Sequence, residues 1–441
     1  MMSDIMSGPA TPNSEKLYAR AREVMPGGNT RTTVYRKPHQ IYARRGDGCR
    51  ITDIDRHVRI DALGNSTSLI HGYGNRQILE AATRQLEAGT CFGMPTESEI
   101  RLSEILCDRL PSVEQLRYTN SGTEAVMNAI KAARAYTGRP KIAKCEGAYH
   151  GTYDPAETSL DASPATWGDI DRPGSVPAAE GTPQGVLDDV VVIPFNNTPV
   201  AEAILRASGN SLAAVLVDVM PNRAGLVPAK SDYLAMLRRV TRELGALLVL
   251  DEVITFRLGY NGAQGRFDID PDLTTLGKII GGGFAIGAIG GLAEVMSVFD
   301  PSKGKPAVPH GGTFSANPMS MSAGIAALEE LTPAAFEKLE ALGDRFDQGI
   351  RACFARHGIK GQVTGLGSLR RFHLTDAPLS DYRSTFAAAD GAARISALAK
   401  VLFDEGVIIS GNGLMAFSTA MEGADIDEIV RAFDRALPAF A

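Results

Sequence analysis

The sequence predicts an α/β protein whose central sheet is mostly parallel and has helices on both faces. From about residue 76, short apolar runs alternate with segments of helical periodicity. The apolar runs are continuous, which is typical of strands buried on both faces of a sheet. We expect strands at 115–119, 141–145, 190–194, 213–217 and 246–250, and helices at 76–88, 97–110, 123–137, 199–208 and 231–244.

The two ends of the chain predict a smaller α+β domain. Residues 14–26 carry an amphipathic helix, and Ile41–Asp61 has the pattern of two or three short antiparallel strands. Long helices over 318–331 and 333–357 precede a strand–helix–strand–helix tail that ends with a helix over 425–437. We therefore expect an N-terminal part of the small domain, a large domain and a C-terminal part of the small domain, over residues 1–75, 76–315 and 316–441.

Composition excludes several classes of protein. The 441 residues are 44% hydrophobic, and 45 Lys+Arg against 51 Asp+Glu give a net charge of −6, which argues against a nucleic-acid partner. The five cysteines are scattered, as in reduced cytosolic proteins, and no His/Cys/Asp cluster has the spacing of a metal site. The polar start, Met1–Lys16, predicts a short disordered arm without a secretory signal. No apolar run approaches the ~20 residues of a membrane span, so we expect a cytoplasmic protein without a membrane partner.

Residues 152–188 interrupt the alternation of strands and helices. They are rich in Pro, Gly, Ser and Asp and contain Trp167, the only tryptophan. A connection of this length is either a binding loop that covers a site or a disordered linker, and the sequence leaves both readings open.

A candidate phosphate site follows the strand at 115–119. Ser121 and Glu124 have the spacing of a capping box, and Gly122 lets the backbone approach a ligand closely. Free N–H groups at the start of the helix, with the hydroxyls of Ser121 and Thr123, would suit a phosphate. A capping box by itself only starts a helix. Its place at the carboxyl end of a strand, where α/β sheets bind ligands, favours the phosphate.

Two more groups follow strands at the same edge of the sheet. Asp251 ends an apolar run, and a buried carboxylate needs a partner such as a pyridinium nitrogen. The alternative is a structural aspartate that caps the next segment. Val253 would lie on the same face as Asp251 and could pack against a ring. Tyr149 could stack on a flat heteroaromatic ring with His150 beside it, although an isolated Tyr or His is more often structural.

Lys278 is the most informative residue. It precedes the glycine cluster Gly281–Gly283, whereas in a P-loop the glycines come before the lysine. Burial beside a cationic ring would keep this lysine unprotonated, so that it can form an imine and later move a proton. Together with the phosphate cradle, the aromatic pair and Asp251, it completes the parts needed to hold pyridoxal phosphate (PLP).

These motifs resemble the class III aminotransferases of the PLP fold-type I group over nearly the whole chain. Within the class, the sequence is most similar to glutamate-1-semialdehyde 2,1-aminomutases and to β-amino acid (β-phenylalanine) aminotransferases. The specific stretches are Asn120–Glu124, Gly147–Gly151, Leu250–Val253, Thr274–Gly283 and Gly312–Pro318.

The resemblance implies where the cofactor lies. Lys278 would form the Schiff base and Asp251 would face the pyridine nitrogen. The two ring faces would be covered by Tyr149 and Val253. The remaining cofactor-binding positions would be His150 beside the ring and Ser121, Gly122 and Thr123 at the phosphate.

The resemblance also implies a homodimer with shared active sites, because Thr313 would reach the phosphate of the neighbouring subunit's cofactor. Arg31 would hold a substrate carboxylate. Two positions depart from the family: Asp218–Arg223 replaces the usual Glu-Pro segment, and Asn412 stands where the β-amino acid enzymes have an arginine. In those enzymes the arginine binds the carboxylate of the acceptor, so either 2-oxoglutarate is not the acceptor here or Arg223 supplies the missing charge. We expect Arg223 to face the substrate pocket, the alternative being a solvent-exposed loop residue.

The leading functional prediction is therefore a PLP-dependent aminotransferase. It would move the amino group of a carboxylate-bearing amine, such as a β- or ω-amino acid, to a keto acid or aldehyde. The alternatives are glutamate-1-semialdehyde 2,1-aminomutase and, below it, an amino acid racemase or epimerase. An inactive PLP-binding regulator is disfavoured because Lys278, Asp251 and Thr313 are all present.

Overall fold

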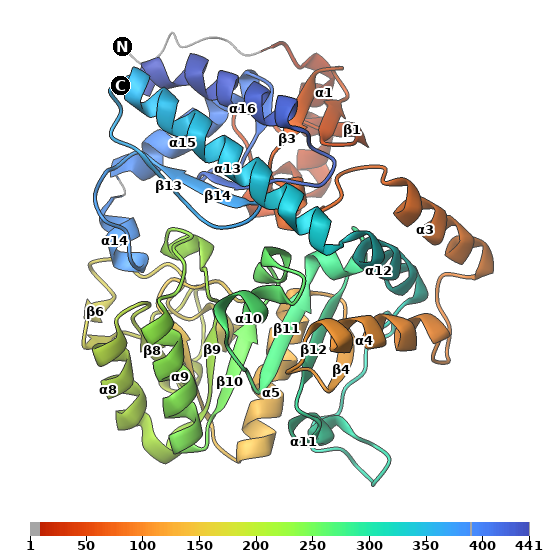
Figure 1. Ribbon diagram of the computed structural model, residues 1–441, viewed down its shortest axis with the longest axis vertical. Coiled ribbons are helices and arrows are strands. Elements are labelled where there is room, and N and C mark those ends of the chain that lie inside the picture. Colours follow the sequence, from red (N-terminus) through yellow and green to blue (C-terminus); the bar gives the residue numbers. More distant parts are fainter. Residues whose placement is uncertain (1–8, 389, 441) are drawn as a thin grey trace.

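The computed structural model describes residues 9–388 and 390–440, which form a large lobe below a smaller one (Figure 1). The large lobe contains a seven-stranded sheet in the order β4-β12-β11-β10-β9-β5-β8. Only β12 runs antiparallel to its neighbours, so the predicted mostly parallel sheet is confirmed. The strands are β4 (Gln115–Thr119), β5 (Lys141–Cys145), β8 (Val190–Ile193), β9 (Leu212–Val217), β10 (Leu247–Asp251), β11 (Leu273–Gly277) and β12 (Gly287–Gly291).

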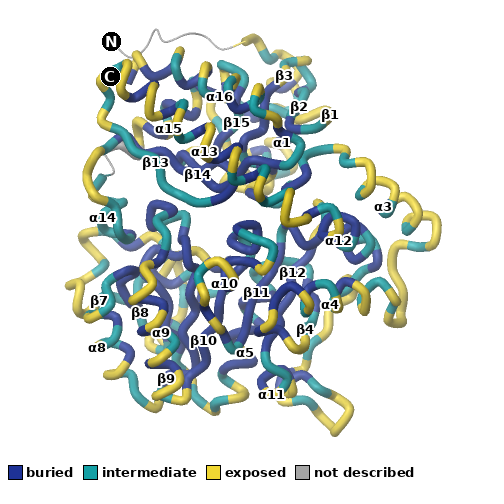
Figure 2. The backbone as a smooth tube through the Cα atoms, viewed as in Figure 1, coloured by how far each residue is buried: buried dark blue, intermediate teal, exposed yellow. Residues whose placement is uncertain are grey.

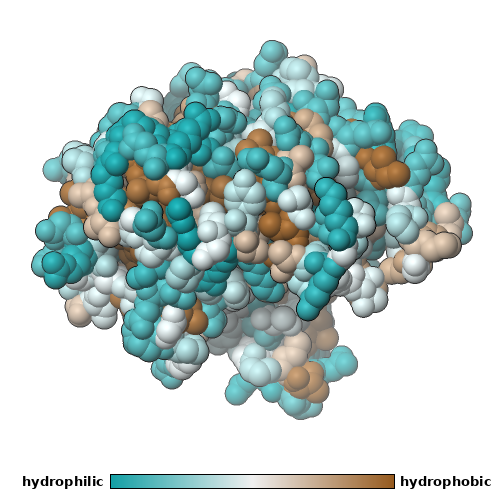
Figure 3. Space-filling model, turned by 90° about the horizontal axis from the view of Figure 1, so that it is seen from below, coloured by the Kyte–Doolittle hydropathy of each residue, from teal (hydrophilic) through white to brown (hydrophobic). Residues whose placement is uncertain are grey.

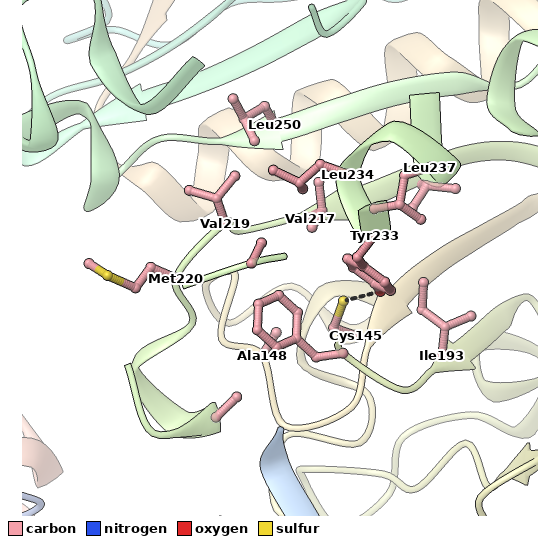
Figure 4. Packing of buried hydrophobic residues seen from close by; sticks show 14 of the residues in the cluster. Cys145, Ala148, Ile193, Val217, Val219, Met220, Tyr233, Leu234, Leu237 and Leu250 are labelled. Atoms are coloured by element: carbon pink, nitrogen blue, oxygen red, sulfur yellow. Dashed lines mark hydrogen bonds between the residues drawn. The ribbon is translucent and has the colours of Figure 1, made fainter. Parts of the chain in front are cut away.

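Helices cover both faces of this sheet. On β9, Val215 and Val217 pack in one core with Leu237 of α9 (Ser231–Leu244), as Figure 4 shows for part of that cluster. Leu216 points the other way and packs in the core that contains α5 (Gly122–Thr137). Successive strand residues face opposite sides, so a strand covered on both faces must be apolar throughout. The remaining helices beside the sheet are α8 (Thr198–Ser208), α10 (Gly262–Phe267) and α11 (Ala293–Met296).

The strands β11 and β12 are not among the expected ones. β12 consists largely of glycine, which is depleted in strands, and its sequence therefore carries no strand signal. The glycines are needed because other backbone lies very close: a Cβ added at Gly287 would be 2.1 Å from the carbonyl oxygen of Ser121. This contact brings β12 against the start of α5, where the phosphate site is expected.

The smaller lobe combines both ends of the chain. Strands β1 (Ala43–Asp47), β2 (Arg50–Asp53) and β3 (Val58–Asp61) continue into β15 (Val407–Ile408), which pairs with β3. Ile60 of β3 is buried in the same core as Phe346 and Phe433, the dark interior of this lobe in Figure 2. The domain limits at 75/76 and 315/316 stay a prediction. The other small-lobe elements are β13 (Gln362–Thr364), β14 (Leu369–His373), β16 (Leu414–Ala416), α13 (Pro333–Arg356), α14 (Tyr382–Ala387), α15 (Asp390–Asp404) and α16 (Gly423–Ala436).

Helices at the side of the large lobe link it to the small one. α12 (Pro318–Glu330) packs on α3 (Arg76–Ala88) and on α4 (Glu97–Arg109), and α3 projects from the side of the molecule (Figure 1). The expected arm over 1–16 is wrong for residues 12–16, which belong to α1 (Pro12–Val24); residues 1–8 lie outside the described part of the chain. The short α2 (Gly64–Thr67) leads from the N-terminal strands to α3.

The 152–188 segment is docked on the smaller lobe. It contains α6 (Asp154–Glu157), β6 (Gly168–Asp169), β7 (Arg172–Pro173) and α7 (Gln184–Asp188). The ring of Trp167 lies edge-on to Phe386 of α14, with 5.2 Å between centroids. The guanidinium of Arg383 lies over the same indole ring and forms a bidentate pair with Glu146. These contacts argue against a plain linker and leave the covering-loop interpretation as a prediction.

The surface is largely polar. Seen from below, the large lobe shows hydrophilic residues with small, separate hydrophobic patches (Figure 3). Among residues 9–388 and 390–440, no helix is both long and apolar enough to span a bilayer.

One buried arginine joins the three segments of the chain. Arg257, 1% exposed, lies in the short helix η5 (Thr255–Leu258) of the large lobe. Its Nη1 donates to the carbonyl of Thr67 at 2.9 Å, and its Nε donates to the hydroxyl of Ser368 at 2.9 Å. Its Nη2 donates to the carbonyl of Phe417. Burial lowers the pKa of Arg257 to about 9, and no acidic side chain in the described part of the chain pairs with it.

We expect Arg257→Lys to lower the free energy of unfolding by about 2 kcal/mol or more, because one ammonium cannot reach all three acceptors and leaves carbonyl groups unsatisfied. Urea unfolding measures the change. Arg351→Lys on the exposed side of α13 is the control and should shift stability by less than about 0.5 kcal/mol. Equal effects of both substitutions would contradict the proposed role of Arg257.

Candidate active site

A cavity of about 460 Å³ lies at the carboxyl ends of the parallel strands. Its volume falls in the range of small-molecule sites, and its place is the one where α/β sheets bind ligands. Eight of the predicted residues line it together: Ser121, Gly122, Thr123, Tyr149, His150, Asp251, Val253 and Lys278.

The start of α5 forms one wall of the cavity. The side chain of Ser121 caps the helix by accepting the N–H of Glu124 at 3.2 Å. The expected capping box is only half formed, because the Glu124 carboxylate accepts the N–H of Asn120 instead of that of Ser121. A Cβ at Gly122 would lie 2.9 Å from Val253, so only glycine leaves room for both. The first N–H groups of the helix therefore open onto a close-packed cradle, which suits a phosphate.

Asp251 is buried at the end of β10 and is held by three donors. Its Oδ2 is 2.7 Å from Nδ1 of His150, and its Oδ1 accepts the N–H of Val253 at 3.0 Å and the hydroxyl of Thr275 at 3.1 Å. Burial alone would raise the pKa of Asp251, but the His150 hydrogen bond, the Val253 N–H and the positive Lys278 outweigh it and lower the pKa. Asp251 is thus an ionised carboxylate aimed into the cavity, able to pair with a protonated ring nitrogen.

His150 is 2% exposed and neutral. Burial lowers its pKa more strongly than Asp251 raises it, so Nδ1–H donates to the carboxylate. Its Nε2 is buried without a partner in the described part of the chain. The histidine therefore orients Asp251 and leaves one lone pair at the wall of the cavity.

Lys278 follows β11 and faces Asp251 and Asp218 across the cavity. Its backbone φ of +51° lies in the left-handed region, which is unusual for a residue with a side chain and is typical of functional sites. Burial lowers the pKa of Lys278, and Arg257 acts in the same direction, whereas Asp251 and Asp218 oppose it. The result is an amine that loses its proton more readily than a surface lysine, as an imine-forming residue requires.

Sequence reasoning did not assign several lining residues. Asn65 and Ser68 come from the N-terminal segment, and Phe284 follows the glycine cluster. Asn65 has a φ of +48° and lies in a polar stretch without periodicity, so nothing in the pattern places it at the cavity. Asp218, which follows β9, also lines the cavity and had no predicted role.

Three predicted residues do not line the cavity in the single chain. Arg31 lies at its rim and donates to Oδ1 of Asn65 at 2.9 Å. Thr313 is exposed in a loop near Asn120, and Arg223 pairs with Asp161 of the 152–188 loop. Asn412 uses its Oδ1 to accept the Ser410 hydroxyl at 2.8 Å, so it contributes no charge. The roles of these residues stay predictions.

The start of α5, the Asp251 carboxylate and the buried Lys278 meet at one sheet edge, an arrangement that suits a PLP enzyme of fold type I. The chain belongs to the class III aminotransferase family, which its sequence matches over residues 33–437. PLP is the cofactor of that family. The predicted fold, enzyme class and cofactor are confirmed.

Known relatives carry two kinds of name. Glutamate-1-semialdehyde 2,1-aminomutase 2 of Staphylococcus saprophyticus is 36% identical over 431 residues, 96% of this chain and 98% of its own. An omega-transaminase from Sphaerobacter thermophilus has a solved structure with 49% identity and a TM-score of 0.94, covering 96% of this chain and 97% of that one. The β-phenylalanine aminotransferase of Variovorax paradoxus has 35% identity and a TM-score of 0.86, with 98% and 94% coverage.

Asp218 makes a testable contribution to stability. Burial, and then the charge of Asp251, raise its pKa to about 8. Between its ordinary pKa of 3.8 and about 8, the unfolded chain releases this proton and the folded chain keeps it, so stability falls as pH rises, by up to about 1.4 kcal/mol per pH unit.

We expect Asp218→Asn to abolish this part of the pH dependence in the cofactor-free protein, because an amide does not titrate. The unfolding midpoint of the variant should match the wild type near pH 4 and exceed it increasingly up to pH 8. The exposed Asp171→Asn should track the wild type at every pH. A constant difference between Asp218→Asn and wild type would show that Asp218 is ionised when folded.

Proposed function

We propose that this protein is an aminotransferase that takes the amino group of a β- or ω-amino acid and passes it to a keto acid or aldehyde. The observation that carries the proposal is the convergence of Lys278, Asp251 and the start of α5 on one cavity, with Arg31 at its rim. Identities of 49% and 35% to enzymes named as an omega-transaminase and a β-phenylalanine aminotransferase support this substrate class.

Each group would have a distinct task. PLP supplies an electron sink when bound. Asp251 would keep the ring nitrogen protonated, and Tyr149 and Val253 would cover the two faces of the ring. Ser121, Gly122 and Thr123 would hold the phosphate. The amine of Lys278 would carry the cofactor and then move the proton between the substrate carbon and the cofactor. Arg31 would hold the substrate carboxylate, and Arg223 is proposed to act on the substrate from outside the cavity.

The test is a half-reaction of the PLP form without a keto acid. Glutamate, β-phenylalanine, β-alanine, alanine and an ω-amine are added separately while the absorbance of the lysine-bound cofactor is followed. We expect a β- or ω-amino acid to remove that band and to give one equivalent of oxo product. Lys278→Ala should lower the rate of product formation by at least about a hundredfold, because the proton-transfer group is lost.

The second candidate is glutamate-1-semialdehyde 2,1-aminomutase, favoured by 36% identity to enzymes of that name. If none of these amines converts the cofactor, but the pyridoxamine form makes 5-aminolevulinate from glutamate 1-semialdehyde, this second function replaces the first. Appearance of the opposite enantiomer without oxo product would instead indicate a racemase.

A homodimer with shared active sites is part of the proposal. Thr313 is exposed in the single chain although its loop runs beside Asn120 of the cavity. Large apolar side chains, among them Phe92 (50% exposed) and Met94 (76% exposed), lie open on the segment between α3 and α4, as expected of an interface. The five cysteines are free thiols, which fits the proposed cytoplasmic location.

We expect Met94→Asp to convert the dimer to a monomer, because a buried unpaired carboxylate in the interface is unfavourable. Sedimentation velocity measures the mass, and a PLP titration should show weaker binding once the partner's Thr313 is lost. Val58→Asp, at an exposed apolar position on β3, is the matched control and should stay dimeric. A wild-type monomer that binds PLP fully would refute the shared site.

A further inference from the structure

The helix α14 of the small lobe contacts the turn that carries two residues of the cavity. Tyr149 and His150 line the cavity. They follow Glu146 and Gly147, which come directly after β5. The ring of Tyr382 on α14 lies against this turn, since a Cβ added at Gly147 would be 2.0 Å from the Cδ2 atom of that ring. The small lobe therefore packs on the backbone two residues before the tyrosine that is proposed to cover the cofactor ring.

Arg383, the next residue of α14, binds the same turn through its charge. Its Nε donates to Oε2 of Glu146 at 2.7 Å, and its Nη2 donates to Oε1 at 2.9 Å. Glu146 is 2% exposed, and no second side chain in the described part of the chain donates to its carboxylate. A buried carboxylate without its cation is strongly unfavourable, so the position of Glu146 depends on this one arginine.

The same guanidinium also holds the 152–188 loop. Its Nη1 donates to the carbonyl of Gly168 at 2.9 Å, and its Nη2 donates to the carbonyl of Trp167 at 3.0 Å, where α14 lies beside β6 (Figure 1). The guanidinium carbon is 4.8 Å from the centre of the indole ring. The hydrogen bonds of Arg383 thus join three segments that are remote in sequence: α14, the loop and the turn after β5.

The loop and the turn are also connected to each other directly. The backbone N–H of Gly147 donates to the carbonyl of Ser159 at 2.9 Å. Nζ of Lys144, a fully buried residue of β5, donates to the carbonyl of Thr158 at 2.7 Å. Because these contacts join the loop to the turn, a change in how Arg383 holds one of them is passed to the other.

We propose that Arg383 is a positioning residue for the cofactor, acting through the turn that Glu146 begins. This turn brings Tyr149 and His150 to the cavity. Tyr149 would cover the ring, and His150 donates to Asp251, so a shift of the turn would disturb both the ring face and the carboxylate for the ring nitrogen. The inference rests on the proposed function, because it uses the proposed place of PLP, and it gives the small lobe a part in holding the cofactor.

The test is the affinity of the cofactor-free protein for PLP, with two optical readouts. Arg383→Gln should raise the Kd about tenfold or more, because a buried carboxylate loses its partner and the turn shifts. At saturating PLP, the visible circular dichroism per bound cofactor should fall, since the aromatic ring beside the cofactor is displaced. Trp167 is the only tryptophan, so acrylamide quenching of its emission reports on the loop and should increase.

Two further variants test the pairing itself. Adding Glu146→Gln to Arg383→Gln should recover part of the lost affinity, because a buried amide needs no cation. Arg383→Lys should give an intermediate Kd, since one ammonium can pair with Glu146 but cannot also reach both loop carbonyls. These variants keep the test conclusive if Arg383→Gln alone does not fold.

Arg370→Gln is the matched control. Arg370 is a buried arginine on β14 of the same lobe, and its Nε donates to Asp347 at 2.9 Å. Its loss should lower the unfolding midpoint, because Asp347 loses its cation. The PLP Kd, the circular dichroism of the bound cofactor and the quenching of Trp167 should all stay at their wild-type values.

A folded Arg383→Gln protein with the wild-type Kd for PLP and the wild-type circular dichroism would overturn the positioning role. An equal rise of the Kd in Arg370→Gln would also overturn it, because the effect would then follow from lost stability alone. PLP binding needs no amino donor, so this test succeeds or fails separately from the half-reaction that tests the aminotransferase.

Discussion

The buried carboxylate of Asp251 is the group around which the active site is built. A buried charge is unfavourable unless it is fully hydrogen-bonded. The donors to Asp251 come from three separate parts of the large lobe: His150 after β5, Thr275 on β11 and the backbone of Val253 after β10. Satisfying one anion therefore fixes how three segments meet. The same contacts aim the side chain at the place where a ring nitrogen would lie and set Val253 against Gly122.

The charged groups near Lys278 shift its pKa in opposite directions. Arg257 supplies a positive charge that has no acidic partner among the described residues, while Asp251 and Asp218 act in the other direction. Arg257 also holds backbone carbonyls from both ends of the chain. One side chain thus couples the joining of the two lobes to the electrostatics of the lysine.

The sequence predicted eight residues that line one cavity, because most of them follow strands whose apolar runs are clear. The expected helix at 231–244 coincides with α9, and the strands at 115–119 and 141–145 coincide with β4 and β5. The sequence did not predict β12, where tertiary contact dictates glycine, or Asn65, which reaches the cavity from the short, distorted α2.

The glycine at 287 also bears on how such a chain can diverge. A Cβ added there would lie 2.1 Å from the carbonyl oxygen of Ser121, so a mutation to a larger residue displaces the start of α5 or the strand itself. The glycine therefore restricts how far this strand can vary in sequence, because the strand and the start of the helix beside it must stay in close contact.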